Sequence, residues 1–268
     1  LDDAEVAKRR DDAISRGIGV MTQIYVDRAL NSEVWDIEGN RYIDFAAGIA
    51  VVNTGHCHPR VMAAVTEQMS RFTHTCHQVL PYENYVRLAE RLNAAVPGDW
   101  PKKTVFVTTG AEAIENAVKV ARIATGRNAI IAFGGAFHGR TFLGMSLTGK
   151  VEPYKKGFGA MMPDIYHVPF PQEVHGITTA HAMDGITKLF KADLDPARVA
   201  AIIFEPVEGE GQAHAEPAAD GGALHGGDYG GLGREQPNRF AVQVTWVVIA
   251  GPGEVRPCAE RLAVGAQD

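Results

Sequence analysis

Residues 104–133 read TVFVTTGAEAIENAVKVARIATGRNAIIAF, and this stretch decides the fold. It opens with a β-branched run at 104–109, which predicts a strand. Apolar residues then recur at helical spacing over 111–125, and Gly126 ends the helix. A second apolar strand is expected at 129–133. Short strands that alternate with helices predict an α/β fold with a mostly parallel sheet.

The alternation continues on both sides of this stretch. Further strands are expected at 145–147, 165–168 and 199–204, with a helix at 182–191, and beyond residue 212 only 242–250 resembles a regular element. Towards the N-terminus the sequence predicts a hairpin at 34–45, helices at 60–71 and 82–95, and a stop at Pro97-Gly98. We expect an N-terminal small-domain segment at 1–56 and part of a large domain at 57–212.

Composition excludes several classes of protein. The chain has 268 residues, with 26 Lys and Arg against 32 Asp and Glu, so its net charge of −6 provides no basic field for nucleic acid. Three cysteines, Cys57, Cys76 and Cys258, are too few for a disulfide scaffold. Neither a signal-peptide pattern nor an apolar run of about 18 residues is visible, so we expect a cytoplasmic protein without membrane contact.

The junction at 108–113 is the strongest local motif. A strand is expected to end at Thr109, and a helix begins at once with Gly110 and Ala111. Free backbone N–H groups and the positive end of the helix dipole then meet above the carboxyl end of the strand, which suits a phosphate. The spacing alone fits an ordinary strand-to-helix turn equally well.

Two more segments follow expected strands. In 134–141, Phe137 or His138 could stack on a planar ring, and Arg140 could hold a carboxylate with two hydrogen bonds. In 205–211, the carboxylates of Glu205, Glu208 and Glu210 suit proton handling or pairing with a cation. Solvated surface loops are the alternative explanation for both segments.

A metal site is the rival interpretation. Residues 55–58 read GHCH and residues 74–77 read HTCH, which places four histidines and two cysteines within a short stretch. Neither cluster has the paired Cys-x2-Cys form, and Pro59 marks a corner before a helix. We therefore expect no bound metal.

Taken in order, these segments resemble the class III aminotransferases, a family that uses pyridoxal 5'-phosphate. The likeness runs from about residue 8 to 212. It is carried by residues 34–39, 44–45, 48–51, 53–56, 58–59, 74–76, 78, 108–122, 137–141 and 205–211. The resemblance implies the N-terminal part of a fold-type I transferase, with a small hairpin region and an incomplete large domain.

The resemblance also implies roles for individual residues. Gly110 and Ala111 would hold the cofactor phosphate, while Phe137 would stack on the pyridine ring with His138 beside it. Substrate contacts would come from Ile49, Gln78, Arg140, Glu205 and Glu210. The implied reaction moves the amino group of an ω-amino acid, 4-aminobutyrate first, to 2-oxoglutarate, giving succinate semialdehyde and glutamate in a homodimer. Ornithine or acetylornithine is the alternative substrate, because that branch of the family shares the 137–141 run.

The likeness stops at about residue 212. The family's Schiff-base lysine belongs to its second half, and this chain has no lysine after Lys191. Residues 213–268 are rich in Gly, Ala and Pro and are expected to be a frameshifted or disordered tail. We expect no catalytic lysine and no complete turnover from this chain, so a non-catalytic fragment is the hypothesis that rivals an active enzyme.

Overall fold

The computed structural model describes residues 2–96, 101–172 and 175–205 in full, and the backbone alone of 207–208, 213–214 and 246–249. The chain divides into two compact units. Among the described residues, one unit comprises 2–96 and 101–103, and the other comprises the residues from Thr104 onward. The expected boundary at residue 56 stays a prediction.

The second unit is built on a four-stranded sheet. Its strands are β4 (Ala129–Phe133), β5 (Ile165–Val168), β6 (Val199–Phe204) and β9 (Trp246–Ile249), in the order β5-β4-β6-β9. Strand β4 runs parallel to β5 and to β6, and only β9 is antiparallel to its neighbour. The expected α/β fold with a mostly parallel sheet is therefore confirmed.

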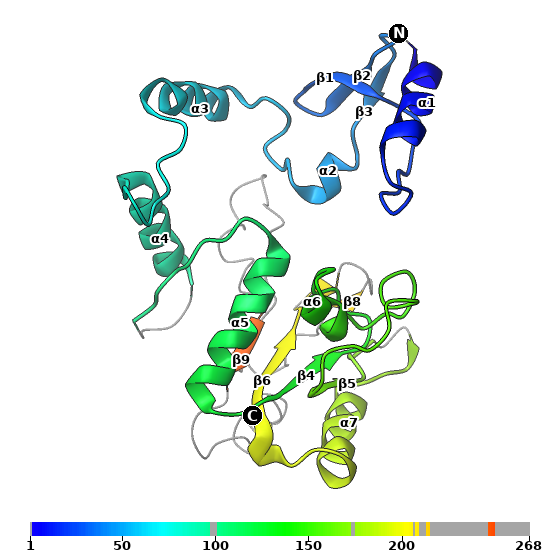
Figure 1. Ribbon diagram of the computed structural model, residues 1–268, viewed down its shortest axis with the longest axis vertical. Coiled ribbons are helices and arrows are strands. Elements are labelled where there is room, and N and C mark those ends of the chain that lie inside the picture. The colour runs from blue at the N-terminus through cyan, green and yellow to red at the C-terminus, as the bar shows by residue number, and fades with distance from the viewer. Residues whose placement is uncertain are drawn as a thin grey trace. The chain divides into compact units, whose positions relative to one another are not determined.

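Helices cover both faces of this sheet (Figure 1). Helices α5 (Gly110–Thr125) and α6 (Phe142–Leu147) pack on one face, against Ile130 and Ala132 of β4. Helix α7 (Thr179–Ala192) packs on the other face, against Ile131 and Phe133. Because successive strand residues point to opposite faces, the unbroken apolar run of β4 serves both layers.

Two expected strands are wrong. Residues 104–109 form no strand, since a strand needs a neighbour for its ladder and no described strand pairs with this segment. The apolar run at 145–147 lies instead at the end of α6. Thr141 caps that helix by accepting a hydrogen bond from the Gly144 N–H. The cap favours a helix here, whereas a run of only three apolar residues is a weak signal for a strand.

The other predicted elements of this unit are confirmed with small shifts at their ends. Helix α5 begins at Gly110 and α7 at Thr179, while a short 3-10 helix, Pro196–Arg198, precedes β6. Strand β7 (Val207–Glu208) pairs with β8 (Ala213–His214), and β9 lies within the expected 242–250 element. Nothing else of residues 213–268, the expected aberrant tail, belongs to the described residues, and neither does the stop at Pro97-Gly98.

The first unit combines a small antiparallel sheet with helices. Its elements are α1 (Asp3–Ala13), β1 (Val26–Leu30), β2 (Glu33–Asp36), β3 (Arg41–Ile43), α2 (Ala47–Ala50), α3 (Pro59–Arg71) and α4 (Glu83–Ala95). The predicted hairpin is confirmed as β2 and β3. Buried Asp36 closes its turn by accepting hydrogen bonds from the Asn40 N–H and the Tyr42 hydroxyl. The sequence prediction missed α1 and β1.

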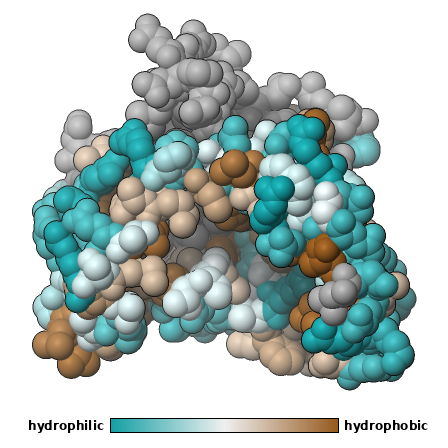
Figure 2. All heavy atoms as spheres, turned by 90° about the horizontal axis from the view of Figure 1, so that it is seen from above, coloured by the Kyte–Doolittle hydropathy of each residue, from teal (hydrophilic) through white to brown (hydrophobic). Residues whose placement is uncertain are grey.

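Large apolar side chains remain at the surface of the first unit. Helices α3 and α4 bury no residue, and Val61, Met69 and Leu88 are exposed. Hydrophobic groups are accordingly visible between polar ones on the surface (Figure 2). None of the described helices is long and apolar enough to cross a membrane.

Candidate functional site

The N-terminus of α5 is fixed by a capping box. The Thr109 hydroxyl accepts a hydrogen bond from the Glu112 N–H (3.0 Å). In return Glu112 Oε2 accepts bonds from the N–H groups of Thr108 (2.9 Å) and Thr109 (3.0 Å). The pKa of Glu112 is held below its ordinary value, first by the hydrogen bond from the Thr108 side chain and then by the backbone donors. Glu112 therefore stays ionised and keeps the turn closed.

This cap leaves the next two backbone donors available. The N–H groups of Gly110 and Ala111 are the first two of the helix and have no intrahelical acceptor. Within the described residues, neither donates to another group of the protein. Gly110 is exposed, and a Cβ atom placed on it would meet nothing within 4 Å. The arrangement can accept an anion such as a phosphate.

The loop that follows β4 packs directly against this turn. Gly139 has φ +107°, and a Cβ atom there would lie 2.8 Å from the Cβ of Ala111. Only glycine allows so close an approach in this backbone conformation. The structure therefore brings the backbone of Gly139, two residues after Phe137, against Ala111 at the start of α5.

Glu205 ties the loop to the neighbouring strand. It follows β6 directly, and only 1% of its surface is exposed. Its Oε2 accepts a hydrogen bond from the Phe137 N–H (3.1 Å). Because β4 and β6 are parallel, their carboxyl ends meet at one edge of the sheet, which is where ligands bind in such folds.

His138 is a buried neutral side chain. It is 2% exposed, and both ring nitrogens lack a hydrogen-bond partner among the described residues. Burial, and secondly the charge of nearby His167, lower the pKa of His138 to about 4. Its backbone N–H donates to the hydroxyl of Thr148 (3.0 Å). The ring cannot carry a charge at neutral pH.

Tyr154 was not predicted but lies beside Phe137 and Arg140, the two side chains of the loop that were expected to bind ligands. Its ring centroid lies 5.0 Å from that of Phe137, and the guanidinium carbon of Arg140 lies 5.9 Å from the same ring. Phe137 is half-buried and Arg140 is exposed. The guanidinium is thus accessible to an anion. Only the aromatic character of Tyr154 could have drawn attention to it in the sequence.

Two of the remaining expected residues belong to the first unit, and one lies outside the described residues. Ile49 is in α2 of the first unit, 88% exposed, with φ +59°. Asp44 supports this turn, since its Oδ1 accepts bonds from the N–H groups of Ala46 and Ala47 while Oδ2 pairs with His56 Nε2 at 2.7 Å. Gln78 is exposed in the same unit. Glu210 lies outside the described residues.

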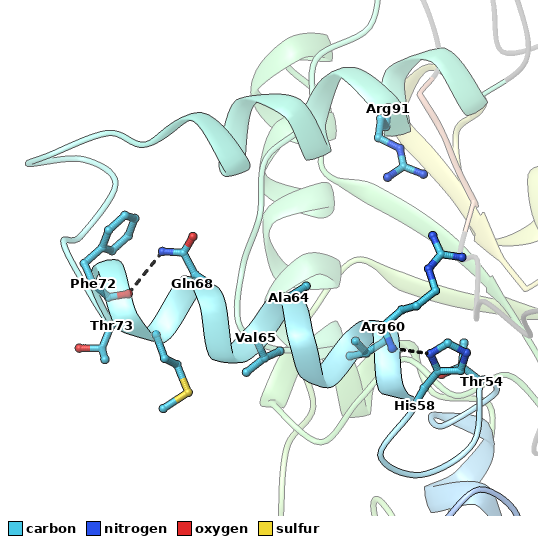
Figure 3. Close-up of a pocket in the computed structure, with 11 residues that line it drawn as sticks. Thr54, His58, Arg60, Ala64, Val65, Gln68, Phe72, Thr73 and Arg91 are labelled. Atoms are coloured by element: carbon cyan, nitrogen blue, oxygen red, sulfur yellow. Dashed lines mark hydrogen bonds between the residues drawn. The ribbon is translucent and has the colours of Figure 1, made fainter.

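A separate hollow of about 940 Å³ lies along α3 and α4. Figure 3 shows Arg60 of α3 and Arg91 of α4 directed into it, with His58 accepting a hydrogen bond from the Arg60 N–H (3.3 Å). None of the predicted site residues lines it. Among the described residues, no group of three or more His, Cys, Asp or Glu side chains is placed to hold a metal.

Comparison with known proteins places this α/β chain in a family. Residues 14–219 match the family described as aminotransferase class-III, and the chain belongs to that family. Its relatives include 5-aminovalerate aminotransferase DavT of Pseudomonas aeruginosa, 55% identical over 204 residues, 76% of this chain and 48% of the relative. The 4-aminobutyrate aminotransferase GabT of Escherichia coli is 53% identical over 215 residues, 80% of this chain and 50% of the relative.

Solved structures of the same kind superpose on the chain. An (S)-enantioselective omega-transaminase from Thermomicrobium roseum gives a TM-score of 0.70 at 28% identity, covering 81% of this chain and 52% of that one. Taurine:2-oxoglutarate aminotransferase from Bifidobacterium kashiwanohense, solved with PLP and glutamate, gives 0.66 at 26% identity, covering 75% and 47%. The chain spans about half the length of the curated relatives it matches.

Proposed function

We propose that the second unit carries the cofactor phosphate and ring site of a pyridoxal-phosphate-dependent aminotransferase that acts on an ω-amino acid with 2-oxoglutarate as the amino acceptor. One observation carries the proposal. The close packing of Gly139 on Ala111 joins an anion-binding helix terminus to a loop with an aromatic ring and an accessible guanidinium. Family membership and the activities for which the relatives are named support the reaction class.

The residues present fit such a cofactor. The N–H groups of Gly110 and Ala111 have no protein acceptor among the described residues and would bind the phosphate, and half-buried Phe137 would cover the ring. When bound, pyridoxal phosphate supplies an electron sink that acidifies the C–H bond beside the substrate's amino group. Neutral His138 adds no positive charge beside this site, so Arg140 is the cation that the loop offers.

The substrate roles follow from charge and position. The guanidinium of Arg140 would bind the distal carboxylate of the ω-amino acid, because it is exposed and its fork matches a carboxylate. Ile49 and Gln78 would line the substrate site, and Glu205 would orient the loop through the Phe137 N–H. Glu210 would pair with the cation that binds 2-oxoglutarate. We propose 4-aminobutyrate first, and 5-aminovalerate as the rival substrate because a 55% identical relative bears that name.

The phosphate site can be tested with one substitution. Gly110→Pro removes the first N–H of α5, and proline suits the first position of a helix. Thr109 already has φ −138° and ψ 155°, the extended conformation that a residue before proline prefers. We expect the affinity of the full chain for pyridoxal phosphate, measured by equilibrium dialysis, to fall at least fivefold without loss of helix in circular dichroism.

A matched control distinguishes the loss of this N–H group from a general effect of proline at the start of a helix. Thr179→Pro makes the same change at the first position of α7, where the preceding Thr178 is also extended (ψ 165°). It should leave the affinity for pyridoxal phosphate unchanged. Equal losses in the two variants, or no binding by the unsubstituted chain, would contradict the proposed phosphate site.

We also propose that this chain holds the cofactor without a covalent bond, because no lysine follows Lys191. Borohydride reduction with pyridoxal phosphate, followed by peptide mapping, should label no single lysine stoichiometrically. Assays with 4-aminobutyrate or 5-aminovalerate and 2-oxoglutarate should form no glutamate. Labelling of one site with turnover would overturn this; Lys155, whose pKa burial lowers, is the side chain to watch.

A homodimer in the cytoplasm is the assembly we propose for the intact protein. The exposed apolar side chains of α3 and α4, among them Val61, Met69 and Leu88, support burial against another subunit. Analytical ultracentrifugation of the full chain should detect self-association in the micromolar range. A strictly monomeric chain at that concentration would contradict the dimer.

A further inference from the structure

Residues 148 and 149, just after α6, hold the 135–138 segment by three hydrogen bonds. The His138 N–H donates to the Thr148 hydroxyl (3.0 Å), the Gly149 N–H donates to the Ala136 carbonyl (2.7 Å), and the Gly135 N–H donates to the Gly149 carbonyl (3.3 Å). We call this pair the 148–149 clamp. Its hydrogen bonds hold the backbone immediately before Gly139 and Arg140.

The Thr148 hydroxyl is the only side-chain group among these three bonds. Thr148 is fully buried at 0% exposure. Besides accepting from His138, its hydroxyl lies 2.9 Å from the Gly144 carbonyl oxygen, one turn back in α6, and 3.5 Å from the Gly139 carbonyl oxygen, and it can donate its single proton to either. A hydroxyl is suited to this place because it both accepts and donates. Removal of the oxygen would leave the buried His138 N–H without its acceptor, which is costly.

Gly149 makes the clamp a close backbone contact. A Cβ atom on Gly149 would lie 2.3 Å from the Gly135 nitrogen and 2.4 Å from the Phe133 carbonyl oxygen. No side chain fits between these atoms, so the two segments stay in contact only with glycine at 149. Residues 148–149 therefore set the position of the 135–138 segment relative to the C-terminal end of β4.

We propose that Thr148 is a positioning residue that holds Phe137 and Arg140 at the N-terminus of α5. The inference rests on the proposed function, since it assigns Thr148 to the loop that would bind the cofactor ring and the substrate carboxylate. Thr148 acts through the backbone of His138 and Gly139 and is not one of the proposed ligand contacts. Its effect reaches Ala111 through Gly139, the next residue along the chain.

The test compares T148V with T148S in the full chain. Valine keeps the shape of threonine and loses the hydroxyl, whereas serine keeps the hydroxyl. In T148V we expect amide hydrogen exchange at His138 to rise at least tenfold, and the nuclear Overhauser effect between Gly139 Hα and the Ala111 methyl group to weaken. T148S should restore both signals, and affinity for pyridoxal phosphate should fall at least fivefold only in T148V.

Thr187→Val is the matched control. The Thr187 hydroxyl also donates to the carbonyl four residues earlier, that of Met183 (3.0 Å), but Thr187 lies exposed on α7. T187V thus removes the same helix bond without touching the loop. It should change neither the Gly139–Ala111 signal nor the affinity for pyridoxal phosphate.

The outcomes separate the inference from the proposed function. An unchanged Gly139–Ala111 signal in folded T148V would overturn the positioning role, whatever the cofactor does. If T148V loses that signal while the unsubstituted chain binds no pyridoxal phosphate, the positioning role stands and the proposed function fails. Should T148V not fold, T148C, whose thiol is a weak acceptor, is expected to give an intermediate rise in His138 exchange, and an unchanged rate there would overturn the proposal.

Discussion

The Phe137 N–H donates a hydrogen bond to Oε2 of Glu205 across a separation of 68 residues in sequence. The bond joins the loop after β4 to the end of β6, at the edge where the two parallel strands finish. Glu205 is buried, so this bond is shielded from water. The loop conformation thus depends on a carboxylate from a different βα unit.

Replacement of Glu205 tests that dependence. Glu205→Ala leaves the Phe137 N–H without this acceptor, and we expect the free energy of unfolding, from urea denaturation of the full chain, to fall by about 1–3 kcal/mol. Glu205→Gln keeps an acceptor oxygen and should lose less. Asp184→Ala, which breaks only the exposed ion pair with Lys188, should change stability by less than about 0.5 kcal/mol. An E205A loss no larger than that of D184A would contradict the role given to Glu205.

Gly139 should tolerate no side chain. In Gly139→Ala the new Cβ would meet the Ala111 Cβ at 2.8 Å, in a backbone with φ +107°. Gly157→Ala is the matched control, because φ is +87° there and nothing lies within 4 Å of the added atom. We expect G139A to lose about 1–3 kcal/mol more than G157A, the additional loss reporting the clash alone. Equal losses would mean that the loop does not pack on α5.

The capping box of α5 predicts a pH effect. The pKa of Glu112 is lowered from 4.5 in the folded chain, first by the Thr108 side chain, so its ionised form stabilises the fold above that pH. This stabilisation is lost as the pH falls below 4.5 towards the lower pKa of the folded state. Unfolding curves of Glu112→Gln and of the unsubstituted chain should therefore differ most near pH 7 and converge below pH 4. A difference that is constant over this range would contradict an ionised cap.

The elements of the second unit were predictable where local chemistry decides them. Helix α5 carries its own boundaries, Thr109 with Glu112 at the start and Gly126 at the end, and β4 is apolar on both faces. The segment at 104–109 has strand composition, but whether it pairs depends on residues distant in sequence. The local pattern cannot supply that information.

The residues of the candidate site also fall into those that local sequence can predict and those that depend on tertiary contacts. Phe137 and Glu205 follow β4 and β6, and the parallel topology brings such positions to one edge of the sheet. Gly110 follows no strand, and its closeness to the loop shows only in the packing of Gly139 on Ala111. Tyr154 and Thr148 reach the loop from segments whose path depends on tertiary packing, and Thr148 directly follows α6. Nothing in their own sequence neighbourhood marks these two residues. The roles assigned to the site residues stay predictions until ligand binding is measured.

The buried ring of His138 makes the chain sensitive to mild acid. Its pKa is about 4 in the folded state against an ordinary 6.5, because burial disfavours the charged ring and nearby His167 adds repulsion. The unfolded chain therefore binds a proton between these values while the folded chain does not, and stability falls as the pH drops from 6.5 towards 4. At about 1.4 kcal/mol per pKa unit, the loss reaches about 3 kcal/mol at pH 4.

His138→Phe should remove this contribution to the pH dependence of stability, while exposed His74→Gln should keep it. His167, whose own pKa is lowered by burial and by Lys155, leaves a residual slope in every variant. Urea unfolding at half-unit steps from pH 7 to 5 would measure the slopes, and an H138F curve parallel to that of H74Q would show that His138 is not held neutral by the fold.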